Sequence, residues 1–128
     1  MIAKRNRFHG TTALRWIYKG GHQARGRHMA IRVRPQDDPA PRIAVMVGRK
    51  VSKSAVVRHR IRRRLFELFR TRLMTASAGL GIVVTVYDES LQMLPIDELY
   101  KETEYLLSKA RVMSTPREGR AIVKRERE

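Results

Sequence analysis

The chain has 128 residues, with 28 lysines and arginines against 12 acidic residues, so its formal net charge is +16 and its sequence pI is near 11.4. Its length and 42% hydrophobic content suit one compact domain rather than two. Cysteine is absent, which excludes disulfides and thiolate chemistry, and no apolar run approaches the roughly 20 residues that span a bilayer. The start of the sequence also lacks the apolar region of a secretory signal. We therefore expect a cytoplasmic protein with no membrane partner, whose charge favours a phosphate-rich ligand.

The first half of the chain predicts one helix and two strands. Threonines cap a short helix over residues 11–19, which a pair of glycines ends. Apolar and basic side chains alternate imperfectly over residues 27–34, which is typical of a strand. Proline and aspartate over residues 35–41 predict a turn and a hairpin-like connection. The continuous apolar run over residues 43–47 predicts a central, well-buried strand.

The second half predicts a long basic helix, a third strand and a last helix. Ser52 or Ser54 offers an N-cap for a helix from about residue 54 to residue 76. Residues 82–87 are rich in β-branched side chains and predict a strand, and Pro95 suits the first turn of the last helix. The apolar stripe expected on the basic helix is Ile61, Leu65, Leu68 and Phe69. The inward face expected on the last helix is Ile96, Leu99, Tyr100, Leu106 and Leu107.

The predicted order is therefore helix, strand, strand, long basic helix, strand, helix, in a small α/β or α+β domain. We expect this single domain to occupy residues 1–112. Residues 113–128 mix proline, glycine and alternating charges with too few large apolar side chains to pack, so we expect a mobile charged tail.

The basic helix predicts an RNA-binding surface. Five of its arginines fall within two turns without a carboxylate among them, so their mutual repulsion favours an external polyanion. Arginine holds phosphate bidentately or stacks on a base, and the N–H groups at the helix start also attract anions. A merely solvated helix face is the alternative, although such faces usually interleave acidic residues. The predicted RNA-binding residues are Arg49, Lys50, Lys53, Arg58, His59, Arg60, Arg62, Arg63 and Arg64.

A second candidate surface comes from the first helix and first strand. Leu14 and Tyr18 are one helical turn apart, and Tyr18 can stack on a nucleotide, although simple core packing explains the pair equally well. Arg32 and Arg34 alternate with apolar residues, so one face of the sheet can be basic and suited to an extended polynucleotide. Ordinary solvent exposure is the alternative for these two arginines.

Catalytic and metal-binding motifs are nearly absent. The sequence has no GxxxxGK[ST], HExxH or GxSxG motif, and its acidic residues are scattered. None of the four histidines pairs with another at i and i+4, and their surroundings are basic. We therefore predict no catalytic residue and no metal site in the protein itself.

The run KVSKSAVVRHRIRR, from Lys50 to Arg63, resembles the signature of the bacterial ribonuclease P protein component. The core of that signature usually reads Arg-Asn-Arg, an apolar residue, then Lys-Arg, so His59 stands at the place of the asparagine. The run RIAVMVGRK from Arg42 resembles the strand before the motif. The first helix also matches in spacing, through Arg7, Leu14, Ile17 and Tyr18. The resemblance covers about residues 5–110.

This resemblance implies an α+β fold, a two-layer α/β sandwich whose helix-strand-strand-helix-strand-helix core contains a left-handed β-α-β crossover around the basic helix. It implies an accessory subunit of an endoribonuclease, with catalysis by an RNA subunit and its Mg²⁺ and no cofactor bound by the protein alone. The partners implied are this catalytic RNA, docked through Arg58, Arg60 and their neighbours, and the 5′ leader of precursor tRNA in a central cleft. The cleft aromatics of the family map to Leu14, Tyr18 and Arg32, so two of three positions depart from the family pattern. With Arg34, the predicted leader cleft comprises Leu14, Tyr18, Arg32 and Arg34.

Two other functions fit a small basic domain. A ribosomal or ribosome-assembly protein that binds rRNA without a catalytic role has the same charge and fold class. A DNA-binding regulator with the basic helix in the major groove is a third hypothesis, but no short helix directly precedes the basic helix to complete a helix-turn-helix unit.

Overall fold

The computed structural model of the protein describes residues 10–114, and residues 1–9 and 115–128 lie outside this description. The tail predicted over residues 113–128 therefore lies outside it too, apart from Met113 and Ser114, which end the last helix. The elements in chain order are α1 (Gly10–Gly20), β1 (His22–Arg25), β2 (Met29–Pro35), β3 (Arg42–Val47), α2 (Ala55–Leu68), a π-helical segment (Phe69–Leu73), β4 (Leu80–Val86), a 3-10 turn (Glu89–Met93) and α3 (Ile96–Ser114). No helix among the described residues is long and apolar enough to cross a membrane.

The four strands form one sheet in the order β1-β2-β4-β3. β4 pairs antiparallel with β2 and parallel with β3, so the β-α-β crossover through α2 is confirmed, while its left-handed sense stays a prediction. The predicted hairpin-like connection over residues 35–41 is wrong, because β4 lies between β2 and β3 and the connection passes across its end. The prediction that residues 43–47 form a central strand is also wrong, since β3 is an edge strand.

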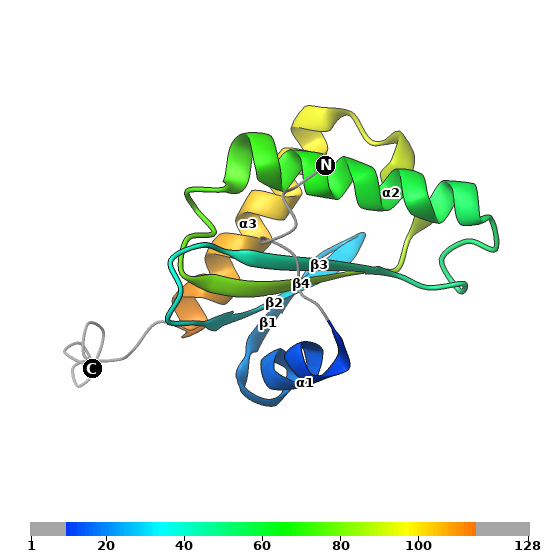
Figure 1. Ribbon diagram of the computed structural model, residues 1–128. Coiled ribbons are helices and arrows are strands. Elements are labelled where there is room, and N and C mark those ends of the chain that lie inside the picture. Colours follow the sequence, from blue (N-terminus) through cyan, green and yellow to red (C-terminus); the bar gives the residue numbers. More distant parts are fainter. Residues whose placement is uncertain (1–9, 115–128) are drawn as a thin grey trace.

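The helices cover the two faces of the sheet unequally (Figure 1). α2 and α3 lie on one face, where α3 contacts β1 and β2 and α2 contacts β3. The main hydrophobic core lies between these helices and the sheet, with fully buried side chains such as Ile31, Leu65 and Ile82. α1 lies on the opposite face against β2 and β4. The predicted α+β fold with a helix layer on a sheet is therefore confirmed, with α1 added on part of the other face.

The basic helix forms as predicted at its start and differs at its end. The Ser54 side chain caps it by accepting a hydrogen bond from the Val57 N–H at 3.2 Å. The predicted apolar stripe is buried: Ile61, Leu65, Leu68 and Phe69. The regular helix ends at Leu68 rather than near residue 76 and continues as the π-helical segment. Phe69 and Leu73 of this segment are both buried in the core.

Two short elements were not predicted, and one side chain on α3 is placed differently. β1 has the sequence HQAR, in which only Ala24 is apolar, so its pairing with β2 rather than a sequence period defines it. The 3-10 turn follows Asp88, whose carboxylate accepts a hydrogen bond from the Ser90 N–H. The inward face of α3 is confirmed at Leu99, Leu106 and Leu107. Ile96 is 42% exposed, because it lies in the first turn beyond the sheet-covered part of the helix.

Candidate nucleic-acid interface

Cationic side chains gather at the start of α2. The turn before it is closed by a hydrogen bond from the Val51 N–H to the Gly48 carbonyl, and Ser52 accepts one from the Ser54 N–H. The side chains of Arg49, Lys50 and Lys53 are exposed in this segment. They lie beside the free N–H groups of the first helical turn, which carry partial positive charge, so this end of α2 attracts anions.

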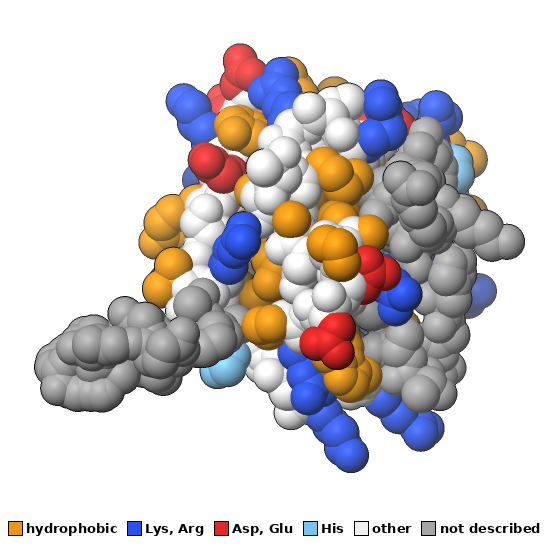
Figure 2. Space-filling model, turned by 60° about the vertical axis from the view of Figure 1, so that its left-hand side comes forward, with side chains coloured by type: hydrophobic (Ala, Val, Ile, Leu, Met, Phe, Trp, Pro, Cys, Tyr) orange, Lys and Arg blue, Asp and Glu red, His pale blue; other side chains and the backbone are white. Residues whose placement is uncertain are grey.

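The exposed side of α2 continues this positive charge. His59, Arg60 and Arg63 are exposed, whereas Arg58 and Arg62 are half-buried beside the core stripe. Within residues 14–113, the side chains of Arg62 and Arg63 make no hydrogen bond or ion pair with the protein. We call the set Arg49, Lys50, Lys53, His59, Arg60, Arg62 and Arg63 the basic α2 surface. On the side of the molecule drawn in Figure 2, lysine and arginine side chains are also spread over the surface, with fewer acidic side chains among them.

Two arginines of α2 are partly engaged within the protein. One terminal nitrogen of Arg58 donates to the Ser52 carbonyl at 2.9 Å, which ties the helix to its preceding turn. One terminal nitrogen of Arg60 donates to Oε1 of Gln92 at 3.0 Å in an exposed contact. Each guanidinium has five N–H donors, so both retain donors for an external phosphate.

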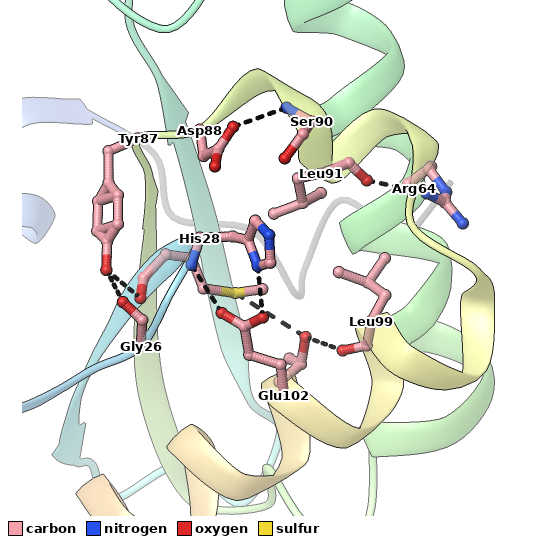
Figure 3. A network of polar contacts seen from close by, with 11 residues as sticks. Gly26, His28, Arg64, Tyr87, Asp88, Ser90, Leu91, Leu99 and Glu102 are labelled. Carbon is pink, nitrogen blue, oxygen red and sulfur yellow. Dashed lines mark hydrogen bonds and ion pairs between the residues drawn. The ribbon is translucent and has the colours of Figure 1, made fainter.

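Arg64 has a different role from its neighbours. Its guanidinium donates to the carbonyls of Leu91, Gln92 and Leu94 at 2.9, 3.0 and 2.5 Å, and Figure 3 shows it directed at the segment between β4 and α3. Burial of this guanidinium lowers the pKa of Arg64 from its ordinary value. The structure therefore places Arg64 as a support for that segment, apart from the basic α2 surface.

A groove of about 580 Å³ runs along the exposed side of α2. Its lining includes the apolar side chains of Val56, Leu68 and Ile96, the cationic side chains of Arg60 and Arg63, and one acidic side chain, Glu67. Val56 is 66% exposed. The basic α2 surface therefore borders a partly apolar groove, a combination that suits the phosphates and bases of a nucleic acid.

The second predicted surface lies on the face of the sheet that carries α1. Side chains alternate along the strands, and the strand register places Gln23, Arg32, Val83 and Ala44 in one row across this face. We call this surface the α1 face. The other strand residues on this face are Arg25, Ala30, Arg34, Arg42, Met46, Gly81 and Thr85.

On α1, Ile17 is fully buried, Leu14 is half-buried and Tyr18 is 46% exposed. The structure thus brings Tyr18 together with Arg32, whose guanidinium carbon lies 5.5 Å from the centre of the Tyr18 ring. Arg34 lies 4.3 Å from the centre of the Trp16 ring and donates to the Trp16 carbonyl at 2.6 Å. Both arginines are half-buried against α1, so the alternative of ordinary solvent exposure is wrong for them.

Sequence reasoning missed the β3 and β1 contributions to the α1 face. Met46 is 41% exposed there, and Arg25 lies 5.0 Å from the centre of the Tyr87 ring. The signal for Met46 lies in the continuous apolar run of β3, which predicts a central, well-buried strand. In the structure the outward half of that run, Ala44 and Met46, lies where α1 does not cover the sheet.

Several acidic groups of the described residues have structural contacts. Glu102 accepts hydrogen bonds from the His28 backbone N–H at 2.9 Å and pairs with its ring Nδ1 at 2.7 Å, which ties α3 to the turn between β1 and β2 (Figure 3). Glu67 bonds Arg70, and this contact helps to hold the pKa of Glu67 down at about 2. Residues 10–114 contain no group of three or more histidine, cysteine or acidic side chains that could hold a metal ion.

Comparisons with known proteins agree with this architecture. A family model described as Ribonuclease P matches residues 2–111. A curated Ribonuclease P protein component from Pseudanabaena is 32% identical over 115 residues, which cover 88% of this chain and 97% of the relative. One from Symbiobacterium thermophilum is 33% identical over 119 residues, which cover 92% and 100%.

Solved structures of low sequence identity share the fold. A Staphylococcus aureus RNase P protein mutant superposes with a TM-score of 0.73 at 21% identity, covering 84% of this chain and 90% of that chain. The RNase P protein from Thermotoga maritima has a TM-score of 0.67 at 20% identity, covering 75% and 89%. With the family match spanning nearly all of the described residues, the chain belongs to the Ribonuclease P family of protein components.

Proposed function

We propose that this chain acts as the protein subunit of ribonuclease P by presenting two different surfaces to two different RNAs. Membership of the family makes it a ribonuclease P component of tRNA processing, and its charge of +16 suits RNA binding. The observation that carries the proposal is the basic α2 surface, whose arginines either lack internal partners among the described residues, as Arg63 does, or keep unused donors, as Arg60 does. The assignment of each RNA to a surface follows from the shape and chemistry of the two surfaces.

The basic α2 surface is proposed to dock on the catalytic RNA. It joins the positive end of a helix to a row of arginines and a partly apolar groove, so it can hold phosphates and contact exposed bases together. Arg60 and Arg63 are the central contacts, because both are exposed and line the groove. Arg58 contributes its remaining donors, and His59 supplies a smaller hydrogen-bonding group between two arginines.

The α1 face is proposed to hold the 5′ leader of precursor tRNA. It is a sheet surface with an exposed tyrosine, an exposed methionine and several arginines, which suits an extended single strand whose bases stack and whose phosphates need charge. Tyr18 is the proposed stacking residue, and Leu14 lies one turn earlier on the same flank.

The protein is proposed to leave bond cleavage to the RNA subunit. Residues 10–114 present no group of three or more metal-ligating side chains, and the Mg²⁺ of the reaction is expected to be bound by RNA. The chemistry that remains for the protein is the neutralisation of phosphate repulsion between catalytic RNA and substrate. A cytoplasmic location belongs to the same proposal.

Reconstitution tests the proposed function. The purified chain is combined with its cognate catalytic RNA, and cleavage of precursor tRNA is measured at low Mg²⁺ concentration. We expect a rise in cleavage rate relative to RNA alone, because the protein supplies charge that Mg²⁺ otherwise provides. An unchanged rate, with the chain instead recovered on ribosomes and crosslinked to rRNA, would overturn the proposal.

A further inference from the structure

Arg34 contacts α1 through its guanidinium, so it acts as a structural clamp on this helix rather than as a free phosphate ligand. Its guanidinium stacks on the Trp16 ring, with 4.3 Å from its central carbon to the ring centre, and one of its nitrogens donates to the Trp16 carbonyl at 2.6 Å. That carbonyl lies near the C-terminal end of α1, where the helix carries partial negative charge, and its second lone pair can accept from the arginine. Arg34 thus binds the C-terminal part of α1 and covers the Trp16 ring at once.

Arg32 holds the same end of the helix on its other flank. It donates to the Gly21 carbonyl at 2.8 Å and lies over the Tyr18 ring. Trp16 and Tyr18 are roughly 200° apart around the helix axis, so the two arginines grip α1 on both sides of the buried Ile17. The Nε of Arg32 is buried and has no hydrogen-bond partner, so Arg34 is the better-satisfied half of the clamp.

Glycine at position 20 makes room for this clamp. A Cβ built on Gly20 would lie 2.5 Å from the guanidinium carbon of Arg34 and 2.6 Å from its Nε. The backbone of Gly20 does not have a positive φ, so glycine is not required there by conformation. The space is reserved for the arginine side chain. At Gly21 the obstacles to a Cβ are backbone carbonyls at 2.7 and 2.8 Å, which cannot move aside.

We propose that Arg34, admitted by Gly20, is a positioning residue that fixes α1, and with it Tyr18, over the sheet for binding of the precursor-tRNA leader. The inference rests on the proposed function of the α1 face. α1 has 11 residues and is too short to hold its shape or direction alone. Among residues 14–20 of α1, Ile17 is the one fully buried side chain, so the arginine contacts help to set the orientation of the helix. The leader therefore contacts Tyr18, while Arg34 acts through the helix.

Gly20→Ala is the sharpest test, because it displaces the Arg34 guanidinium without changing any charge. Only the flexible end of a side chain must move, and alanine favours the helix more than glycine, so the fold is retained. Trp16 is the only tryptophan of the chain and reports the clamp directly. We expect its emission to shift to longer wavelength and its quenching by acrylamide to rise, because the ring loses its cover.

In the reconstituted holoenzyme, Gly20→Ala should raise KM for precursor tRNA with a long leader about 5- to 20-fold. We expect kcat, and KM for a substrate with a one-nucleotide leader, to stay within twofold of wild type. Gly48→Ala is the matched glycine control, since its Cβ meets no atom within 4 Å. A general structural defect would change both substrates alike and would overturn the inference.

Arg34→Met provides a second variant that does not depend on the glycine, and Arg34→Lys tests rescue by a conserved charge. Arg27→Met removes one exposed charge outside the two proposed RNA surfaces. We expect Arg34→Met and Arg34→Lys to reproduce the leader-dependent KM effect and the Trp16 spectrum, and Arg27→Met to change neither. If Arg27→Met raises KM as much as Arg34→Met, or Lys restores binding, charge rather than position is the cause and the inference fails. Failure of the wild-type chain to stimulate cleavage would instead refute the proposed function.

Discussion

Arg63 and Arg64 are adjacent in the sequence, and the structure predicts opposite consequences of replacing them. Arg64 donates to three backbone carbonyls between residues 91 and 94, whereas Arg63 is exposed and has no partner among the described residues. Arg64→Ala therefore removes a support of the fold, and Arg63→Ala removes only an external contact.

The size of the effect follows from the three hydrogen bonds. A hydrogen bond from a charged donor contributes about 1.5–3 kcal/mol when well buried. Arg64 is only partly buried, and water replaces part of each bond in the variant, so we take about 1 kcal/mol for each carbonyl. Arg64→Ala should lower the free energy of unfolding by about 3 kcal/mol, and Arg63→Ala should change it by less than about 0.5 kcal/mol.

Urea unfolding measures the free energy, and titration of the catalytic RNA at several salt concentrations measures the binding. For Arg63→Ala we expect the plot of log affinity against log salt to become shallower by about 1, as for the loss of one phosphate contact. The Arg64→Ala variant, where it is folded, should keep the wild-type slope of log affinity against log salt. Equal stability of the two variants, or loss of slope in Arg64→Ala alone, would refute the division of roles.

Three further outcomes are expected. Arg60→Ala combined with Arg63→Ala should reduce the salt slope by about 2 while leaving the urea midpoint almost unchanged, and an unaltered slope would remove both residues from the interface. Ser54→Ala should lower the free energy of unfolding by about 1 kcal/mol in the same urea assay, since it deletes the N-cap of α2. Arg70→Ala should raise the pKa of Glu67 from about 2 toward its ordinary value, because the hydrogen bond that favours the ionised carboxylate is lost. NMR titration of the Glu67 side chain checks this shift, and an unmoved midpoint would show that Arg70 does not hold the carboxylate.

Local patterns were enough to predict the helices and the basic surface. The period of the apolar stripe on α2 and the Ser54 cap depend on residues within a few positions of one another, so they are visible in the sequence. The same holds for the row of arginines with no carboxylate among them. β1 has too few apolar residues to be predicted from its own sequence. β3 is an edge strand because β4, which comes later in the chain, lies between β2 and β3 in the sheet.

The roles of individual arginines depend on distant partners. Arg64 contacts carbonyls 27 to 30 positions later, and Arg34 contacts a carbonyl 18 positions earlier, so neither role has a local signal. Charge alone therefore assigned Arg32, Arg34 and Arg64 to RNA contacts. Packing against α1 and against the 3-10 segment distinguishes them from Arg60 and Arg63.

The claim that two surfaces serve two RNAs is tested most directly by crosslinking. The chain has no cysteine, so Val56→Cys on the α2 groove and Met46→Cys on the α1 face each give one attachment point for a photocrosslinker and leave every arginine in place. In the holoenzyme with precursor tRNA bound, we predict that position 56 crosslinks to the catalytic RNA and position 46 to the 5′ leader. Crosslinks from both positions to the same RNA, or the reverse assignment, would contradict the account.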